Sequence, residues 1–151
     1  MLKNYVIMSN MIFGHKKHIE PGKLTSNGVA LEKHEFKTIA FLLSLGFDVS
    51  LIPRSTEVGV QTPDIFMLGR QWEIKCPKGS GKCLLQNTIQ RAVEQSENII
   101  VDLSRIRIPQ YKCIPELERQ LYRSKRGQRL KIITKGRKIL DFSKDAYYNI
   151  K

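Results

Sequence analysis

Hydrophobic side chains recur at helical spacing between residues 30 and 45, and polar residues separate them. The positions on the predicted apolar face are Leu31, Phe36, Ile39, Ala40, Leu42 and Leu43. Gly46 follows this run, as glycine often does directly after a helix. The pattern therefore predicts a helix over residues 30–45 that rests on a sheet.

Short apolar runs bounded by turn-forming residues predict strands in the middle of the chain. Residues 47–52 form one such run, which Pro53 stops. Residues 64–68 and 71–76 form two more, and the turn near Gly69 should join them as a hairpin. Residues 98–103 read NIIVDL, an almost continuous apolar run that is typical of a buried central strand.

Two further helices and a closing strand pair complete the pattern. Residues 84–96 predict a helix, and a later one should run from Pro115 to about residue 125, because proline favours the first helical turn. Residues 129–134 and 135–142 predict the closing strands. The order α-β-β-β-α-β-α-β-β indicates an α/β fold, with a mixed β-sheet flanked by helices.

The length of 151 residues predicts a single folded domain over residues 29–151. Residues 1–28 gather Pro, Gly, Ser and Asn near their end, so we interpret them as an N-terminal extension. A short strand at residues 5–8 is the one regular element expected there. No apolar run reaches the length of a membrane span, and no signal peptide is predicted.

The charge of the chain predicts a polyanionic partner. The formal net charge is +12, and residues 104–139 hold twelve Lys or Arg against Glu116 and Glu118. Nucleic acid is the favoured partner, and an anionic membrane surface is the next candidate. Three cysteines without a CxxC pair argue against a disulfide framework and a zinc knuckle, and they fit a reducing cytoplasmic site of action.

The candidate chemistry lies in the predicted hairpin. Side chains alternate along a strand, so Glu73 and Lys75 share one face while Trp72 and Ile74 point to the other. Pairing through the turn would bring Asp64 close to Glu73. Two carboxylates are hard oxygen ligands for Mg²⁺ or another divalent cation, and a nearby lysine can stabilise charge on a phosphoryl group. The alternative is a surface ion pair between Glu73 and Lys75, with Asp64 capping a loop.

Four blocks of the sequence resemble a known family. HEFKTIAFLLSLGFDV, TPDIFMLGRQWEIKCPKG, NTIQRAVEQSENIIVDLSR and RLKIIT are similar, in this order, to the tRNA nuclease C-terminal domain of CdiA proteins. Those proteins are toxins of contact-dependent growth inhibition, and the domain belongs to the PD-(D/E)xK nuclease superfamily. The resemblance spans roughly residues 31–141 and implies a restriction-endonuclease-like fold.

The resemblance also implies roles for single residues. Asp64 and Glu73 match metal-binding acids, Lys75 matches the catalytic lysine, and Glu35 matches a catalytic acid on the first helix, where we prefer it to Glu32. Polar residues are expected to bind substrate on the helix after the hairpin and on the basic segment: Asn87, Arg91, Gln95, Arg105 and Arg107. The first three lie four apart and so share one helical stripe.

The function expected from this resemblance is that of a metal-dependent ribonuclease that cleaves tRNA. The expected cofactor is Mg²⁺ or another divalent cation, and the expected partners are tRNA and an acidic immunity protein, with no membrane. The protein would act in the cytoplasm, either of a target cell after delivery as part of a larger toxin or as a stand-alone protein. A DNA endonuclease of phage or restriction type and a non-catalytic nucleic-acid-binding module are the two alternatives.

Overall fold

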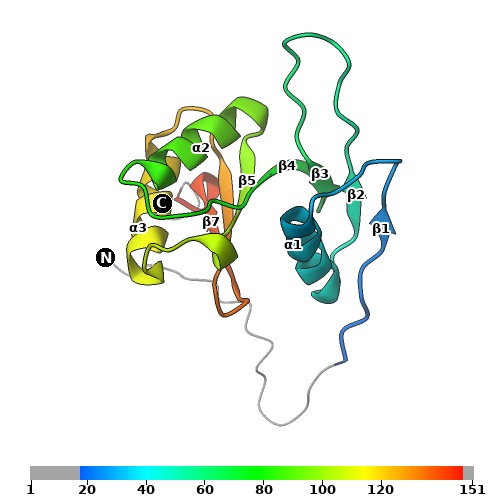
Figure 1. The fold of residues 1–151 in the computed structure, drawn as a ribbon, viewed down its shortest axis with the longest axis horizontal. Helices are drawn as coiled ribbons and strands as arrows, with labels where there is room; N and C mark the ends of the chain where they lie inside the picture. The colour runs from blue at the N-terminus through cyan, green and yellow to red at the C-terminus, as the bar shows by residue number, and fades with distance from the viewer. Residues whose placement is uncertain (1–17, 148–151) are drawn as a thin grey trace.

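The structure is a computed structural model that describes residues 18–147 (Figure 1). Within that range, seven strands form one sheet in the order β1 to β7. Their bounds are Leu24–Thr25, Val49–Leu51, Ile65–Met67, Arg70–Lys75, Asn98–Asp102, Arg129–Ile133 and Ile139–Ser143. The helices are α1 (Lys33–Ser44), α2 (Leu84–Gln95) and α3 (Gln110–Arg123), with 3₁₀ turns η1 (Leu103–Arg105) and η2 (Lys144–Tyr147).

Strand β4 joins an antiparallel part of the sheet to a parallel part. On one side, β2, β3 and β4 pair antiparallel, and on the other, β4, β5 and β6 pair parallel. The predicted hairpin is confirmed, because Ile65 pairs with Trp72. Leu68 and Gly69 both have positive φ, 54° and 72°, which a tight hairpin turn of this kind requires.

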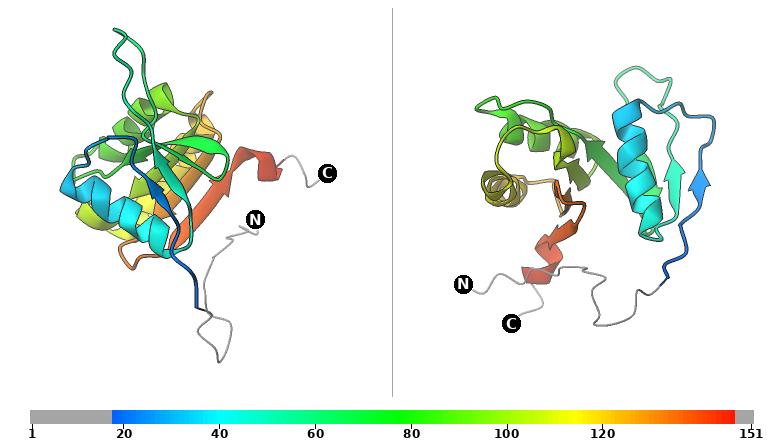
Figure 2. Two further views of the ribbon diagram at one scale, coloured as in Figure 1. Left: turned by 90° about the vertical axis from the view of Figure 1, so that its right-hand side faces the viewer. Right: turned by 60° about the horizontal axis from the view of Figure 1, so that its bottom comes forward.

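The helices cover opposite faces of the sheet (Figures 1 and 2). Helix α1 packs Ile39 and Leu42 on the face that carries Trp72, Ile74 and Ile100. Helices α2 and α3 pack on the other face, which is formed by residues such as Ile99, Val101, Leu130 and Ile132. Because all five residues of β5 are buried between these layers, the mixed α/β fold predicted from the sequence is confirmed.

One predicted boundary is wrong. Helix α3 begins at Gln110, and Pro115 lies inside it rather than at its first turn. Cys113 is fully buried in the same core cluster as Leu117 and Leu121, and its thiol donates a hydrogen bond to the carbonyl of Ile108. We infer that this packing favours a helical turn before the proline, at the cost of one backbone hydrogen bond.

The segment predicted as an irregular extension contributes one strand. Leu24–Thr25 pairs parallel with β2, so the sheet gains an edge strand that side-chain patterning could not reveal in two exposed residues. The strand expected at residues 5–8 lies outside the described residues, and the domain boundary at residue 28 stays a prediction. No helix within residues 18–147 is long and apolar enough to cross a bilayer.

Candidate active site

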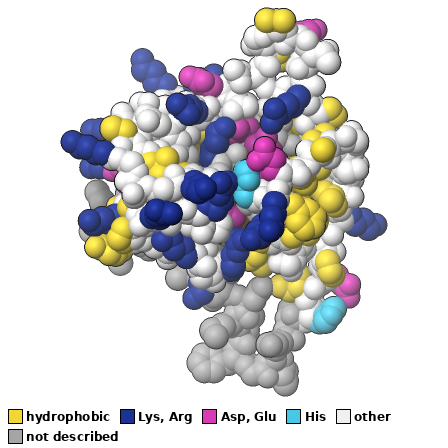
Figure 3. All heavy atoms as spheres, viewed as in Figure 1, with side chains coloured by type: hydrophobic (Ala, Val, Ile, Leu, Met, Phe, Trp, Pro, Cys, Tyr) yellow, Lys and Arg dark blue, Asp and Glu magenta, His cyan; other side chains and the backbone are white. Residues whose placement is uncertain are grey.

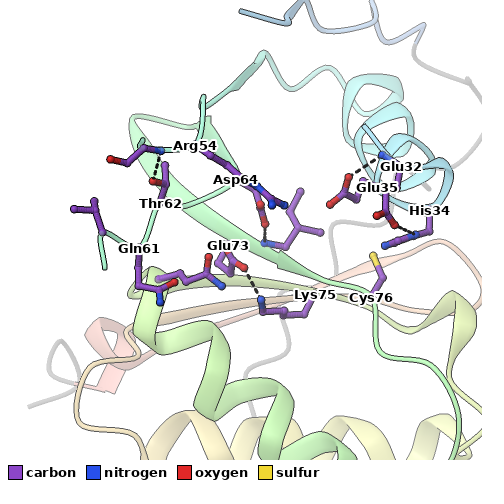
Figure 4. Close-up of a pocket in the computed structure, with 14 residues that line it drawn as sticks. Glu32, His34, Glu35, Arg54, Gln61, Thr62, Asp64, Glu73, Lys75 and Cys76 are labelled. Carbon is purple, nitrogen blue, oxygen red and sulfur yellow. Dashed lines mark hydrogen bonds and ion pairs between the residues drawn. The ribbon is translucent and has the colours of Figure 1, made fainter. Parts of the chain in front are cut away.

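The hairpin brings Asp64, Glu73 and Lys75 together at one pocket (Figure 4). Asp64 directly precedes β3, and its backbone N–H donates to the carbonyl of Trp72, which places it beside Glu73 on β4. Lys75 is two residues further along β4, so it shares the face of Glu73. Trp72 and Ile74 point to the α1 face instead, as the alternation predicted.

Glu73 is buried with only one of its oxygens satisfied. Its residue is 2% exposed, and Oε1 accepts a hydrogen bond of 2.6 Å from Lys75 Nζ. Oε2 is buried and has no hydrogen-bond partner among the described residues. Burial raises the pKa of Glu73 to about 7, the hydrogen bond from Lys75 opposes this rise, and the negative charge of Asp64 adds to it.

A backbone amide fixes the carboxylate of Asp64. Its Oδ2 accepts a hydrogen bond of 2.7 Å from the N–H of Ile74, the residue between Glu73 and Lys75. This bond crosses from the start of β3 to β4, so the hairpin itself orients the carboxylate. Glu73 and Lys75 do form an ion pair, but it is not the surface pair considered above. Its acid, Glu73, is buried, and a second acid, Asp64, lies beside it.

The pocket around these residues is an open cavity of about 550 Å³. Its walls come from the start of α1, the long β2–β3 loop and the end of α2. The loop contributes Arg54, Gln61 and Thr62, which the sequence indicated only as part of an irregular segment. Only Gln61 and Thr62 had a signal in the sequence, their place just before Pro63 and Asp64, because loop residues beside candidate site residues often line the site; Arg54 had no such signal.

Glu35 lines the same pocket, but its carboxylate caps helix α1. Its Oε2 accepts a hydrogen bond of 2.9 Å from the N–H of Glu32, and the side chain of Glu32 accepts one from the backbone N–H of Glu35, which forms a capping box at the start of α1. Glu32 Oε2 also lies 3.4 Å from His34 Nδ1. The predicted catalytic role of Glu35 stays a prediction, with a helix-capping role now visible beside it.

The predicted substrate residues divide into three groups. Gln95 lines the pocket that holds Glu73. Asn87 and Arg91 line a smaller adjoining hollow of about 300 Å³, which Lys75 also lines. Arg105 and Arg107 line neither cavity; Arg105 belongs to η1, and the backbone N–H of Arg107 donates to Gly79.

The donor set fits a divalent cation of the Mg²⁺ type. Within residues 18–147 there is no cluster of three or more His, Cys, Asp or Glu, so a cage built wholly from side chains is not present there. Mg²⁺, however, is commonly held by one or two carboxylates and keeps several waters. Asp64 and Glu73 supply two carboxylates, and the partnerless Oε2 of Glu73 is the buried oxygen that such an ion would satisfy.

A second buried acid, Asp102, was not identified from the sequence. It ends β5, is 1% exposed, and accepts hydrogen bonds from Thr38 Oγ1 at 2.6 Å and from Arg137 at 2.9 Å. Its other oxygen accepts from the N–H of Ser104. These bonds tie α1 and the β6–β7 turn to the central strand. Thr38 also lies 3.4 Å from the thiol of Cys76, whose pKa burial raises to about 11.

Comparison with protein-family models gives a match to this chain. The family model for the contact-dependent growth inhibition CdiA C-terminal domain matches residues 61–139, more than half of the 151 residues. The chain belongs to this family. It is therefore a toxin domain of contact-dependent growth inhibition, and the matched residues include Asp64, Glu73 and Lys75.

A solved structure shares the fold of this CdiA C-terminal domain. The structure, described as the CdiA-CT/CdiI toxin and immunity complex from Burkholderia pseudomallei, matches with a TM-score of 0.59 and 17% sequence identity. The match covers 81% of this chain and 99% of that chain. A comparison with curated proteins gives no match.

Proposed function

We propose that this toxin domain is a metal-dependent ribonuclease that inhibits growth by cleaving tRNA. The observation that carries the proposal is the state of Glu73, a buried carboxylate with a partnerless oxygen, held against Asp64 and bonded to Lys75. A fold that needed only packing here would gain stability from an apolar residue. Desolvated acids with raised pKa values in a cleft are typical of functional sites.

Each residue has a distinct part in the proposed hydrolysis. Asp64 and Glu73 would hold the divalent cation, which supplies Lewis-acid stabilisation of the phosphoryl group and a more acidic bound water. Lys75 lies at the rim of the same pocket, with its side chain 26% exposed, so its ammonium can approach a phosphate while still contacting Glu73. There it would stabilise the charge that builds on the phosphate oxygens.

Two features support a nucleic acid as the substrate. The net charge of +12 suits a polyanion, and Lys and Arg are concentrated in residues 104–139. Helix α3 of this segment packs against α2, whose last residue, Gln95, lines the pocket. Figure 3 shows Lys and Arg side chains distributed over one face of the molecule, around a small group of Asp and Glu side chains. The open cavity admits a phosphodiester of a large nucleic acid rather than only a small molecule. The choice of tRNA rests on the resemblance of the sequence blocks to tRNA nuclease domains.

Incubation of the purified protein with tRNA and, separately, with plasmid DNA tests the substrate and the metal together. We expect cleavage of tRNA with Mg²⁺, none in EDTA, and none of the DNA. Asp64→Asn should abolish cleavage, whereas Asp48→Asn, at an exposed aspartate outside the pocket, should not. Equal cleavage of both nucleic acids would show that the protein is not specific for RNA. Undiminished cleavage in EDTA would refute the proposed dependence on a metal ion.

We also propose that an acidic immunity protein binds this domain over the cleft. The similar solved structure is a toxin and immunity complex, and the basic face around the pocket favours a partner of opposite charge. Co-expression with the cognate immunity protein should restore growth and should block tRNA cleavage in vitro. If the immunity protein binds while cleavage continues, its binding site lies away from the cleft.

A further inference from the structure

A further hollow lies beside the candidate active-site pocket, at the opposite end of β4 from Lys75. It is a groove of about 640 Å³ between the β3–β4 turn, the end of α2 and the turn that joins α3 to β6. Ten residues line it: Gly69, Arg70, Gln71, Gln95, Ser96, Glu97, Asn98, Lys125, Arg126 and Gln128. None of them is aliphatic or aromatic, so the groove lacks the apolar anchors on which tight protein interfaces depend.

The charge of this groove favours an anion. Arg70, Lys125 and Arg126 are all exposed, and only Glu97 opposes them among the lining side chains. Within residues 18–147, neither Arg70 nor Lys125 has an ion-pair partner within 4.0 Å, and Arg126 contacts only the carbonyl of Glu94, at 3.5 Å. Exposed cations without partners are available for phosphate.

Helix α2 connects this groove to the active site. Gln95, its last residue, lines both the groove and the pocket of Glu73. Arg91 and Asn87 continue the same stripe to the hollow on the other side of Lys75. From Asn87 to Gln95 the helix rises by about 12 Å. The stripe thus runs from the groove past the pocket to the smaller hollow, with Glu73 and Lys75 between its two ends.

We propose that the groove lined by Arg70, Lys125 and Arg126 binds the phosphate backbone of the RNA on one flank of the bond that is cleaved. This inference rests on the proposed ribonuclease function and adds a second contact region to it. The side-chain amides of Gln71, Gln95 and Gln128 also line the groove and can hydrogen-bond to phosphate or sugar oxygens beside the cations. Such a set fits a backbone of alternating phosphate and sugar and carries no base-specific requirement.

The test compares two triple variants with the same loss of charge. One is Arg70→Gln/Lys125→Gln/Arg126→Gln, in the groove. The other is Lys23→Gln/Lys37→Gln/Lys82→Gln, at exposed lysines that line none of these cavities and lie outside residues 104–139. Binding of labelled tRNA is measured by fluorescence anisotropy over a salt series, with Glu73→Gln added to both to prevent cleavage.

We expect the groove variant to lower the slope of log K against log salt by about two to three, because each lost phosphate contact lowers it by about one. Its affinity near physiological salt should fall by roughly 10- to 100-fold. The control should change the slope by less than one. With Glu73 intact, the groove variant should raise KM for tRNA cleavage and leave kcat unchanged.

Three results would overturn the inference. If both triple variants bind and cleave like the parent protein, the groove is not a backbone site, and the ribonuclease proposal still stands. If the groove variant loses only immunity-protein binding, the groove is a protein surface. If the unmodified protein neither binds nor cleaves RNA, the proposed function fails and the inference fails with it.

Thermal unfolding checks that each variant is folded. If the groove triple variant is unstable, Lys125→Gln alone replaces it, with an expected slope change of about one.

Discussion

Two buried carboxylates on neighbouring strands have opposite surroundings. Asp102 on β5 is 1% exposed, and both of its oxygens accept hydrogen bonds, from Thr38, Arg137 and Ser104. Glu73 on β4 is 2% exposed, and only its Oε1 has a partner. Asp102 thus binds parts of the protein to one another, whereas Glu73 retains an oxygen that nothing in residues 18–147 satisfies.

The pKa values differ in the same way. Burial alone would raise the pKa of Asp102, but hydrogen bonds from Thr38 and Arg137 outweigh burial and hold it below the ordinary value. Burial raises the pKa of Glu73 to about 7, because the single bond from Lys75 is not enough to offset it. A buried acid whose oxygens all accept hydrogen bonds stabilises the fold. A buried acid with an unsatisfied oxygen lowers the stability of the fold, and such acids are typical of functional sites.

Loss of Lys75 should have a large effect on cleavage. Lys75→Met removes the ammonium beside Glu73 while keeping the length of the side chain, and we expect tRNA cleavage to slow on the order of 10³-fold. Initial rates with Mg²⁺ measure this. The control is Lys78→Gln, an exposed lysine three residues further on and outside the pocket. A loss of less than 10-fold for Lys75→Met would show that Lys75 has no part in the chemistry.

Removal of the satisfied acid should instead affect the fold. Asp102→Ala leaves the Arg137 guanidinium and the Thr38 hydroxyl without their acceptor, and we expect the free energy of unfolding to fall by about 3 kcal/mol. That corresponds to a melting temperature lower by roughly 10 °C. Urea unfolding measures the loss, with Glu57→Ala at an exposed loop acid as control. An unchanged midpoint would show that the comparison between the two acids is wrong.

The two acids should also give the unfolding free energy opposite dependences on pH. Glu73 has a pKa raised from 4.5 to about 7, so its contribution to the free energy of unfolding is complete below pH 4.5 and is lost as pH rises through 7. In EDTA, with no metal bound, we expect this loss to be about 3 kcal/mol. Asp102 has a lowered pKa, so its contribution is lost only as pH falls below the ordinary range of aspartate. Unfolding in EDTA between pH 5 and 8 checks the first slope, and flat stability over this range would contradict it.

The smallest expected effect distinguishes the hydroxyl of Thr38 from that of Thr88. Both threonines are buried in helices, but their single hydroxyl hydrogens have different acceptors. That of Thr88 is donated to the carbonyl of Leu84 at 2.7 Å, and that of Thr38 to the carboxylate of Asp102 at 2.6 Å, with the carbonyl of His34 more distant at 3.3 Å. Thr38→Val should therefore destabilise the protein by about 1.5 kcal/mol, and Thr88→Val by about 0.5 kcal/mol. Equal losses in urea unfolding would indicate that the bond to Asp102 contributes little.

The sequence predicted the site better than it predicted the network that supports the site. Strand alternation and the turn near Gly69 were enough to place Asp64, Glu73 and Lys75 together, because these residues lie on one hairpin. Asp102 and Arg137 are 35 residues apart, and Thr38 is 64 residues from Asp102. No local periodicity links such positions, so only the packing of α1 and the β6–β7 turn on β5 reveals them.

The errors in the predicted elements have similar causes. Proline was taken as the start of α3, but the buried Cys113 shows that the helix continues before Pro115. The two-residue strand β1 is held by backbone pairing to β2, and its exposed side chains carry no signal. Local sequence rules thus identify elements with a strong apolar face and fail where tertiary contacts or backbone bonds decide the outcome.

Glu73→Gln, assayed both for cleavage and for unfolding, tests the central claim most directly. The amide cannot carry the charge that burial disfavours, so we predict that the variant unfolds at higher urea than the wild type at pH 8 in EDTA. With Mg²⁺ it should no longer cleave tRNA. A variant that still cleaves tRNA, or one that is destabilised as strongly as Asp102→Ala, would contradict the assignment of Glu73 as the acid held for catalysis.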